Sequence, residues 1–83
     1  MTVKVTVKLF AAYQEAYGVP EIILEVAPGT TVQALGDRVR QPYPELRWLA
    51  PLTRYGVNYE FADPTQPLQN GDELVLIPPV SGG

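Results

Sequence analysis

The 83-residue sequence contains neither cysteine nor histidine. Their absence excludes disulfide bonds, thiolate nucleophiles, imidazole bases and most zinc sites, because all of these depend on sulfur or imidazole groups. Any chemistry of the chain must therefore use carboxylates, hydroxyls or the chain ends. The sequence predicts no metal site and no bound cofactor.

Basic residues are also few, since six Lys and Arg stand against nine Asp and Glu and give a formal net charge of −3. No basic cluster could neutralise a run of phosphates, so we expect no nucleic-acid partner. The longest apolar stretch, Leu74 to Val80, is far shorter than the roughly 20 residues of a membrane-spanning helix. The N-terminus alternates in polarity and does not lead into an apolar segment. We expect a cytoplasmic protein with no membrane partner.

The length fits one small domain, since domains typically contain about 50 to 250 residues. We expect this domain to span residues 1–78 and a flexible tail to span residues 79–83. A domain of this size buries roughly 60 to 65% of the surface that its unfolded chain exposes. That is enough for one core, but it makes an internal catalytic cleft improbable.

The first half of the chain predicts two strands and two helices. Apolar residues at every second position from Val3 to Leu9 indicate a half-buried strand, and residues 21–26 repeat the pattern. Residues 11–18 favour a two-turn helix that ends at Gly18. Residues 32–40 favour the main helix, with Thr30 or Thr31 as its N-cap.

The second half predicts a connection followed by strands. Three prolines in residues 41–51 exclude a continuing helix, and we expect this segment to bring Trp48 into the core. Strands are expected over residues 52–58, 59–62 and 74–77. The resulting order is typical of an α+β fold in which one main helix covers one face of a mixed sheet of four to five strands. Gly36 of that helix is interpreted as a close contact with the sheet.

The face of the sheet that the main helix does not cover carries a predicted binding patch. If the first strand persists to Phe10, that side chain points away from the core, and Ile77 does the same when Leu74 and Leu76 face inward. Phe61 is a third candidate for this side. Phe10, Phe61 and Ile77 together would form an exposed apolar patch of a kind that monomers usually avoid. The alternative is that the strand ends curl, so that these residues cover the margin of the core.

The segment Ile77-Pro78-Pro79-Val80-Ser81-Gly82-Gly83 is the most informative part of the sequence. Two prolines cannot donate to a sheet ladder, so pairing should stop there and the tail should project. Gly82 and Gly83 lack a Cβ and can enter a channel too narrow for other residues. We expect the Gly83 carboxylate to be presented to another protein, although a frayed end without function is the simpler reading.

Two stretches carry a resemblance to a known family: VKLFAAYQEAYG at residues 7–18 and VNYEFADPTQPLQNGDELVLIPPVSGG at residues 57–83. They resemble the small, sulfur-carrier subunits of molybdopterin synthase, which are ubiquitin-like β-grasp proteins of the MoaD/ThiS type. The resemblance implies a β-grasp fold with an extended tail. It also implies that the chain is no enzyme on its own but the sulfur-donating subunit of a sulfurtransferase.

The resemblance implies a cycle with three partners. An E1-like enzyme would use ATP and magnesium to adenylate Gly83, and a persulfide donor would convert it to a thiocarboxylate. Val80, Ser81, Gly82 and Gly83 would then enter the large catalytic subunit, where sulfur passes to cyclic pyranopterin monophosphate. Phe10, Phe61 and Ile77 match the positions of the family's hydrophobic contact with that subunit. The family assembles as a heterotetramer of two small and two large subunits.

Three alternatives remain open from the sequence. Sulfur carriers of the thiamine pathway share the diglycine end and the fold, but they usually lack the helix predicted over residues 11–18. A ubiquitin-like modifier would join Gly83 to lysines by isopeptide bonds. A plain interaction domain would carry an inert tail.

Overall fold

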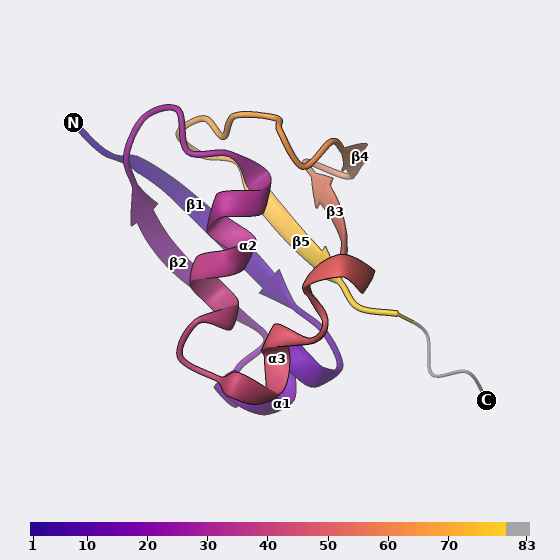
Figure 1. Ribbon diagram of the computed structural model, residues 1–83. Helices are drawn as coiled ribbons and strands as arrows, with labels where there is room; N and C mark the ends of the chain where they lie inside the picture. The colour runs from indigo at the N-terminus through magenta and orange to yellow at the C-terminus, as the bar shows by residue number, and fades with distance from the viewer. Residues whose placement is uncertain (80–83) are drawn as a thin grey trace.

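The computed structural model describes residues 1–79 of the chain, and Figure 1 shows helix α2 lying across a sheet. The strands are β1 (Val3–Leu9), β2 (Glu21–Val26), β3 (Arg54–Val57), β4 (Glu60–Ala62) and β5 (Glu73–Ile77). The helices are α1 (Ala12–Tyr17), α2 (Val32–Arg40), α3 (Pro44–Arg47) and the 3-10 helix η1 (Ala50–Leu52). These elements confirm the predicted α+β class, with α2 as the main helix.

The sheet is mixed and has five strands in the order β2-β1-β5-β3-β4. Strands β1 and β5 pair in parallel, whereas every other neighbouring pair is antiparallel. The first and last strands of the chain therefore lie side by side, and β5 occupies the centre of the sheet. Pro78 and Pro79 therefore follow directly on the central strand of the sheet (Figure 1).

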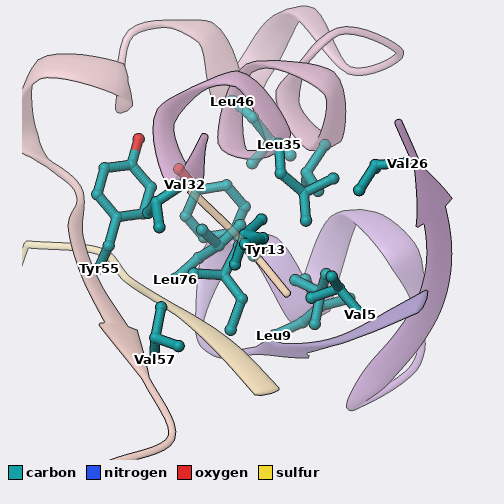
Figure 2. Packing of buried hydrophobic residues seen from close by; sticks show 14 of the residues in the cluster. Val5, Leu9, Tyr13, Val26, Val32, Leu35, Leu46, Tyr55, Val57 and Leu76 are labelled. Atoms are coloured by element: carbon teal, nitrogen blue, oxygen red, sulfur yellow. The ribbon is translucent and has the colours of Figure 1, made fainter. Parts of the chain in front are cut away.

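Alternation along β1 divides the sheet into two unlike faces. Val3, Val5, Val7 and Leu9 are buried, whereas Lys4 is exposed and Thr6 and Lys8 are half-buried between them. The inward side chains pack against helices α1, α2 and α3, as Figure 2 shows from close by. The core contains Val3, Val5, Val7, Leu9, Tyr13, Val26, Val32, Leu35, Val39, Leu46, Leu49, Tyr55, Val57, Leu68, Leu74 and Leu76.

Helix α2 begins and packs as its sequence predicts. Of the two candidate caps, Thr31 is the N-cap, and its side-chain oxygen accepts a hydrogen bond from the Ala34 N–H at 3.1 Å. Val32, Leu35 and Val39 recur at helical spacing and are buried against the sheet. Packing of these buried residues against the sheet therefore fixes the position of the helix.

A buried cation joins three elements across this core. Arg40 is only 2% exposed, and its guanidinium donates to the Tyr13 hydroxyl at 3.1 Å, the Tyr55 hydroxyl at 3.0 Å and Asp37 Oδ1 at 2.7 Å. Burial alone would lower the pKa of Arg40, but the hydrogen bonds with Asp37, Tyr13 and Tyr55 outweigh that effect and raise it. Because both terminal nitrogens of the guanidinium donate to fixed partners, the network specifies how α1, α2 and β3 meet.

Two sequence predictions fail in the connection before β3. Trp48 was expected in the core but is 64% exposed. Leu46 and Leu49 are the buried residues here, and Trp48, the C-cap of α3, lies between them and points outward. The strand expected over residues 52–58 is shorter, because η1 occupies Ala50–Leu52 and β3 begins at Arg54.

Gly36 makes the close contact that the sequence suggested. A Cβ built on Gly36 would lie 2.9 Å from the Tyr55 hydroxyl oxygen and 3.1 Å from an Arg40 guanidinium nitrogen.

We expect Gly36→Ala to lower the free energy of unfolding by roughly 1–2 kcal/mol, because displacing the Tyr55 ring outweighs the gain of about 1 kcal/mol in helix propensity. Urea denaturation measures the change. The exposed Ala34 of the same helix supplies the control, since Ala34→Gly should cost only its propensity; a more stable Gly36→Ala protein would contradict the prediction.

Candidate functional site

The outer face of the sheet, opposite helix α2, contains an apolar hollow. Gly56 of β3 lies between Phe61 of β4 and Val75 of β5 in the strand register. Because Gly56 has no side chain, nothing fills the space between its two neighbours. A hollow of about 160 Å³ results, lined by Gly56, Tyr59, Glu60, Phe61, Val75 and Ile77.

The aromatic walls of this hollow are open to solvent. Phe61 is 80% exposed and Tyr59 is 89% exposed, whereas Val75 and Ile77 are half-buried. The alternative in which strand ends curl to cover the core margin therefore does not describe Phe61. The structure brings two of the three predicted patch residues, Phe61 and Ile77, to one hollow.

Phe10 extends the outer face at the end of β1. Leu9 is paired with Leu76, so Phe10 lies one position further along, at the level of Ile77. Strand β1 ends at Leu9, but Phe10 is still 50% exposed and stays out of the core. Phe10 does not line the hollow itself.

Backbone strain is concentrated beside this face. Within residues 1–79, the non-glycine residues with positive φ are Ala11 at 49°, Asn58 at 51° and Tyr59 at 72°. Ala11 directly follows Phe10, and the other two form the turn between β3 and β4 that leads to Phe61. Such conformations cost side-chain-bearing residues about 1–2 kcal/mol each, and strain of this kind clusters at functional sites.

The charges on the outer face are partly paired. Lys8 on β1 forms a salt bridge with Glu21 on β2 at 2.5 Å, and this hydrogen bond is the main reason why the pKa of Lys8 is raised. Glu60 approaches the hollow with its backbone oxygen, which lies 3.6 Å from a Cβ built on Gly56, and in the strand register it pairs with the buried Val57. Since paired residues share a face of the sheet, the register assigns the Glu60 side chain to the inner side and not to the hollow.

The predicted tail begins where the ladder ends. Strand β5 stops at Ile77, and Pro78 and Pro79 follow it without secondary structure, as expected for residues that cannot donate to a sheet. Val80, Ser81, Gly82 and Gly83, the residues predicted for tail insertion and sulfur chemistry, lie outside the described residues. The division between domain and tail at residue 79 stays a prediction.

The described part of the chain gives little support for other kinds of site. No group of three or more carboxylates that could hold a metal ion occurs in residues 1–79. None of the helices in this part is long and apolar enough to cross a membrane. The cytoplasmic location stays a prediction.

Sequence reasoning missed Tyr59 and Gly56 as parts of this face. Neither Tyr59 nor Gly56 is among the residues that the sequence analysis expects on this face. The signal for Tyr59 was present, because Asn58 and Tyr59 form a two-residue hairpin loop at a place where Asn-Gly is the favoured pair. A tyrosine in that second position is conformationally costly and thus worth attention.

The ThiS family model matches residues 7–83, which include most of the domain and the diglycine. The chain belongs to the ThiS family. This confirms the resemblance drawn from residues 7–18 and 57–83.

Named relatives agree with this family. The chain is 39% identical to a molybdopterin synthase sulfur carrier subunit from Mycobacterium tuberculosis, over 98% of this chain and 99% of that protein. It is 34% identical to a protein of the same name from Arabidopsis thaliana, over 99% of this chain and 85% of that protein. The crystal structure of SAMP1 from Haloferax volcanii superposes with a TM-score of 0.77 at 29% identity, covering 96% and 99% of the two chains.

The strained turn after Phe10 gives a stability prediction for this ThiS-family chain. Ala11 is the second residue of a four-residue turn that the Tyr13 N–H closes by donating to the Phe10 carbonyl at 3.0 Å. With φ 49° and ψ −121°, Ala11 occupies a position that glycine adopts without cost. We expect Ala11→Gly to raise the free energy of unfolding by roughly 0.5–1 kcal/mol, as measured by urea denaturation. Ala34→Gly, at an exposed helical position, should have the opposite sign; two losses of similar size would contradict the prediction.

Proposed function

We propose that this chain is the sulfur-carrier subunit of a molybdopterin synthase. The observation that carries the proposal is the family match through Gly82 and Gly83, together with the sulfur-carrier name of full-length relatives at 34% and 39% identity. The absence of cysteine fits a carrier whose sulfur is supplied from outside the chain. The chain performs no catalysis alone and contributes the donor sulfur to the synthase.

The chemistry of the proposal is centred on the carboxylate of Gly83. A carboxylate is a poor acyl donor until its oxygen is converted into a leaving group. An E1-like enzyme with ATP and magnesium supplies the leaving group by forming an acyl adenylate and releasing pyrophosphate. The outer sulfur of a persulfide donor then attacks the acyl carbon and displaces AMP, which gives an acyl disulfide. A thiol attacks the donor's sulfur in that S–S bond, forms a disulfide with the donor and releases Gly83 as the thiocarboxylate.

The charged carrier then delivers its sulfur to the large catalytic subunit. Val80 to Gly83 enter the active site, where sulfur is transferred to cyclic pyranopterin monophosphate and the Gly83 carboxylate is regenerated by hydrolysis. Two such transfers complete the dithiolene of molybdopterin. In the proposed assembly, two small and two large subunits form a heterotetramer.

The outer face is the proposed contact with the large subunit. Phe10, Phe61 and Ile77 are all accessible in the domain alone, and β5 leads directly from this face to the diglycine. A partner that buries these residues holds the tail close to its own surface.

A second candidate, protein modification, is favoured by one observation. SAMP1, whose structure resembles this chain, belongs to proteins named small archaeal modifier proteins. In that case, Gly83 would form isopeptide bonds with lysines after adenylation. Carriers of the thiamine pathway share the family, but the names of the full-length relatives favour molybdopterin synthase.

The decisive experiment measures the product at Gly83. We expect incubation with an E1-like enzyme, ATP, magnesium and a sulfur donor to raise the intact mass by the difference between one sulfur and one oxygen atom. A variant lacking Gly83 is the control and should keep its mass. An unchanged wild-type mass, with an enzyme that charges a known carrier, would refute the sulfur-carrier function, and lysine adducts would favour modification.

Phe10→Asp tests the proposed subunit contact. Because Phe10 is half-exposed, a carboxylate there costs little in the free domain, but it must lose its water when a partner covers it. We expect at least a tenfold weaker affinity for the large subunit, about 1.4 kcal/mol, with an unchanged thermal melting temperature. Isothermal calorimetry and a thermal melt measure the two quantities; an unfolded variant would instead place Phe10 in the core.

A further inference from the structure

Asn70 and Gly71 form the centre of the turn that leads into β5. The Asp72 N–H closes this turn by donating to the Gln69 carbonyl at 3.0 Å. Gly71 has a φ of 90°, and both central residues are exposed. Asn-Gly is also the pair at which deamidation is chemically easiest, because glycine has no side chain to hinder attack of its backbone nitrogen on the asparagine amide. The turn therefore contains a potential site of chemical modification.

Deamidation at this pair needs no reactant except water. The Gly71 backbone nitrogen loses its proton and attacks Cγ of Asn70, the bond from Cγ to Nδ2 breaks, and ammonia leaves as a five-membered succinimide closes. Water then opens this ring in one of two ways. Cleavage of the new bond to Cγ gives aspartate, whereas cleavage of the original peptide bond gives isoaspartate. In isoaspartate the main chain runs through Cγ and is one methylene longer.

The backbone of Lys4 binds both reacting groups in the folded domain. The Lys4 N–H donates to Oδ1 of Asn70 at 2.8 Å. The Gly71 N–H, whose nitrogen is the nucleophile, donates to the Lys4 carbonyl at 2.8 Å. A hydrogen bond to the protonated form opposes loss of that proton, and the Asn70 amide cannot turn toward Gly71 while Lys4 binds its oxygen. Both hydrogen bonds must therefore break before the ring can close.

These two hydrogen bonds, here called the Lys4 clasp, lie at the start of the parallel ladder. Strands β1 and β5 begin at the same end of the sheet (Figure 1). Directly after the clasp, the Thr6 N–H donates to the Asp72 carbonyl at 3.0 Å. An extra methylene between Asn70 and Gly71 changes the spacing between the clasp and this ladder. Isoaspartate therefore acts on the pairing that positions β5.

The chain contains one other asparagine, Asn58, which serves as an internal comparison. Its side chain is also engaged, since Nδ2 donates to Asp72 at 3.0 Å and Oδ1 accepts from the Glu73 N–H at 3.0 Å. It is followed by Tyr59, whose side chain hinders attack by the backbone nitrogen. Of the two asparagines, only Asn70 combines a reactive neighbour with protection that depends on the fold.

We propose that Asn70 is a deamidation site that the Lys4 clasp closes in the folded domain and that opens when the start of β1 separates from the turn before β5. Local opening of this kind precedes global unfolding in many proteins, and a slow reaction of the opened state follows its equilibrium population. Each event adds one negative charge to a chain of net charge −3. Molecules that open often are thus modified permanently, whereas closed ones are spared. The inference is independent of the chemistry at Gly83.

The first test compares the folded and the unfolded chain in warm, mildly alkaline buffer. In guanidinium chloride, we expect the intact mass to rise by the difference between a hydroxyl and an amino group, and peptide mapping should place the change at Asn70 and not at Asn58. In the folded domain the same change should be at least roughly tenfold slower. Equal rates would overturn the protection by the clasp, and an unmodified unfolded chain would overturn the site itself.

The second test opens the clasp without changing the Asn-Gly pair. Lys4→Pro removes the N–H that binds Asn70, so the folded variant should deamidate at least roughly threefold faster, and deuterium exchange at the Gly71 amide should rise with it. Thr2→Pro, which lies before β1, is the control and should change neither rate. For a Lys4→Pro chain that does not fold, the wild type at rising sub-denaturing guanidinium concentrations gives the same comparison. Faster exchange with an unchanged deamidation rate would contradict the proposal in either case.

The third test measures what the modification does to the domain. Anion exchange separates the refolded products from the parent protein, because each carries one more negative charge. We expect the isoaspartate form to melt roughly 4–8 °C lower, the shift that loss of about one net hydrogen bond produces in a domain of this size. Asn70→Asp keeps the oxygen acceptor and the length of the main chain, and should shift the melting temperature much less. Equal melting of the isoaspartate form and the wild type would overturn the assigned effect on the β1–β5 pairing.

Discussion

The parallel pairing of β1 with β5 is the constraint on which the rest of the structure depends. It places the last strand between the first strand and β3, at the centre of the sheet. A central strand is held on both edges, so the residues that follow it start from a fixed point. Pro78 and Pro79 then end the ladder, and the segment with the diglycine begins at a defined position on a rigid support.

The two faces of the sheet have different roles, since the inner face forms the core and the outer face is the proposed binding surface. Helices α1, α2 and α3 pack on its inner face, and the buried Arg40 network joins α2 to α1 and β3. In the described residues 1–79, no helix covers the outer face, and Phe61 and Tyr59 are exposed. Substitutions on the outer face can therefore alter recognition without dismantling the core, because the two faces share only the backbone of the strands.

The strained turns lie next to exposed aromatic residues that are proposed to bind a partner. Ala11 and Tyr59 adopt backbone conformations that glycine would adopt at lower cost, and each lies next to an exposed aromatic residue of the outer face. The free energy that folding gains in the core is large enough to tolerate such positions. Natural proteins commonly accept a cost in stability at positions that serve function, and the exposed rings beside these turns are the proposed contact with a partner.

The sequence by itself determined the inner face, because alternation in β1 and helical spacing in α2 depend only on local periodicity. It also indicated Phe10, Phe61 and Ile77, since parity assigns each residue of a strand to one face. Tertiary structure decided what local patterns do not encode. Trp48 is exposed because Leu46 and Leu49 fill the core at that point, and the space above Gly56 becomes a hollow only when β4 and β5 lie on either side of it. Such features depend on neighbours distant in sequence, and no window along the chain contains them.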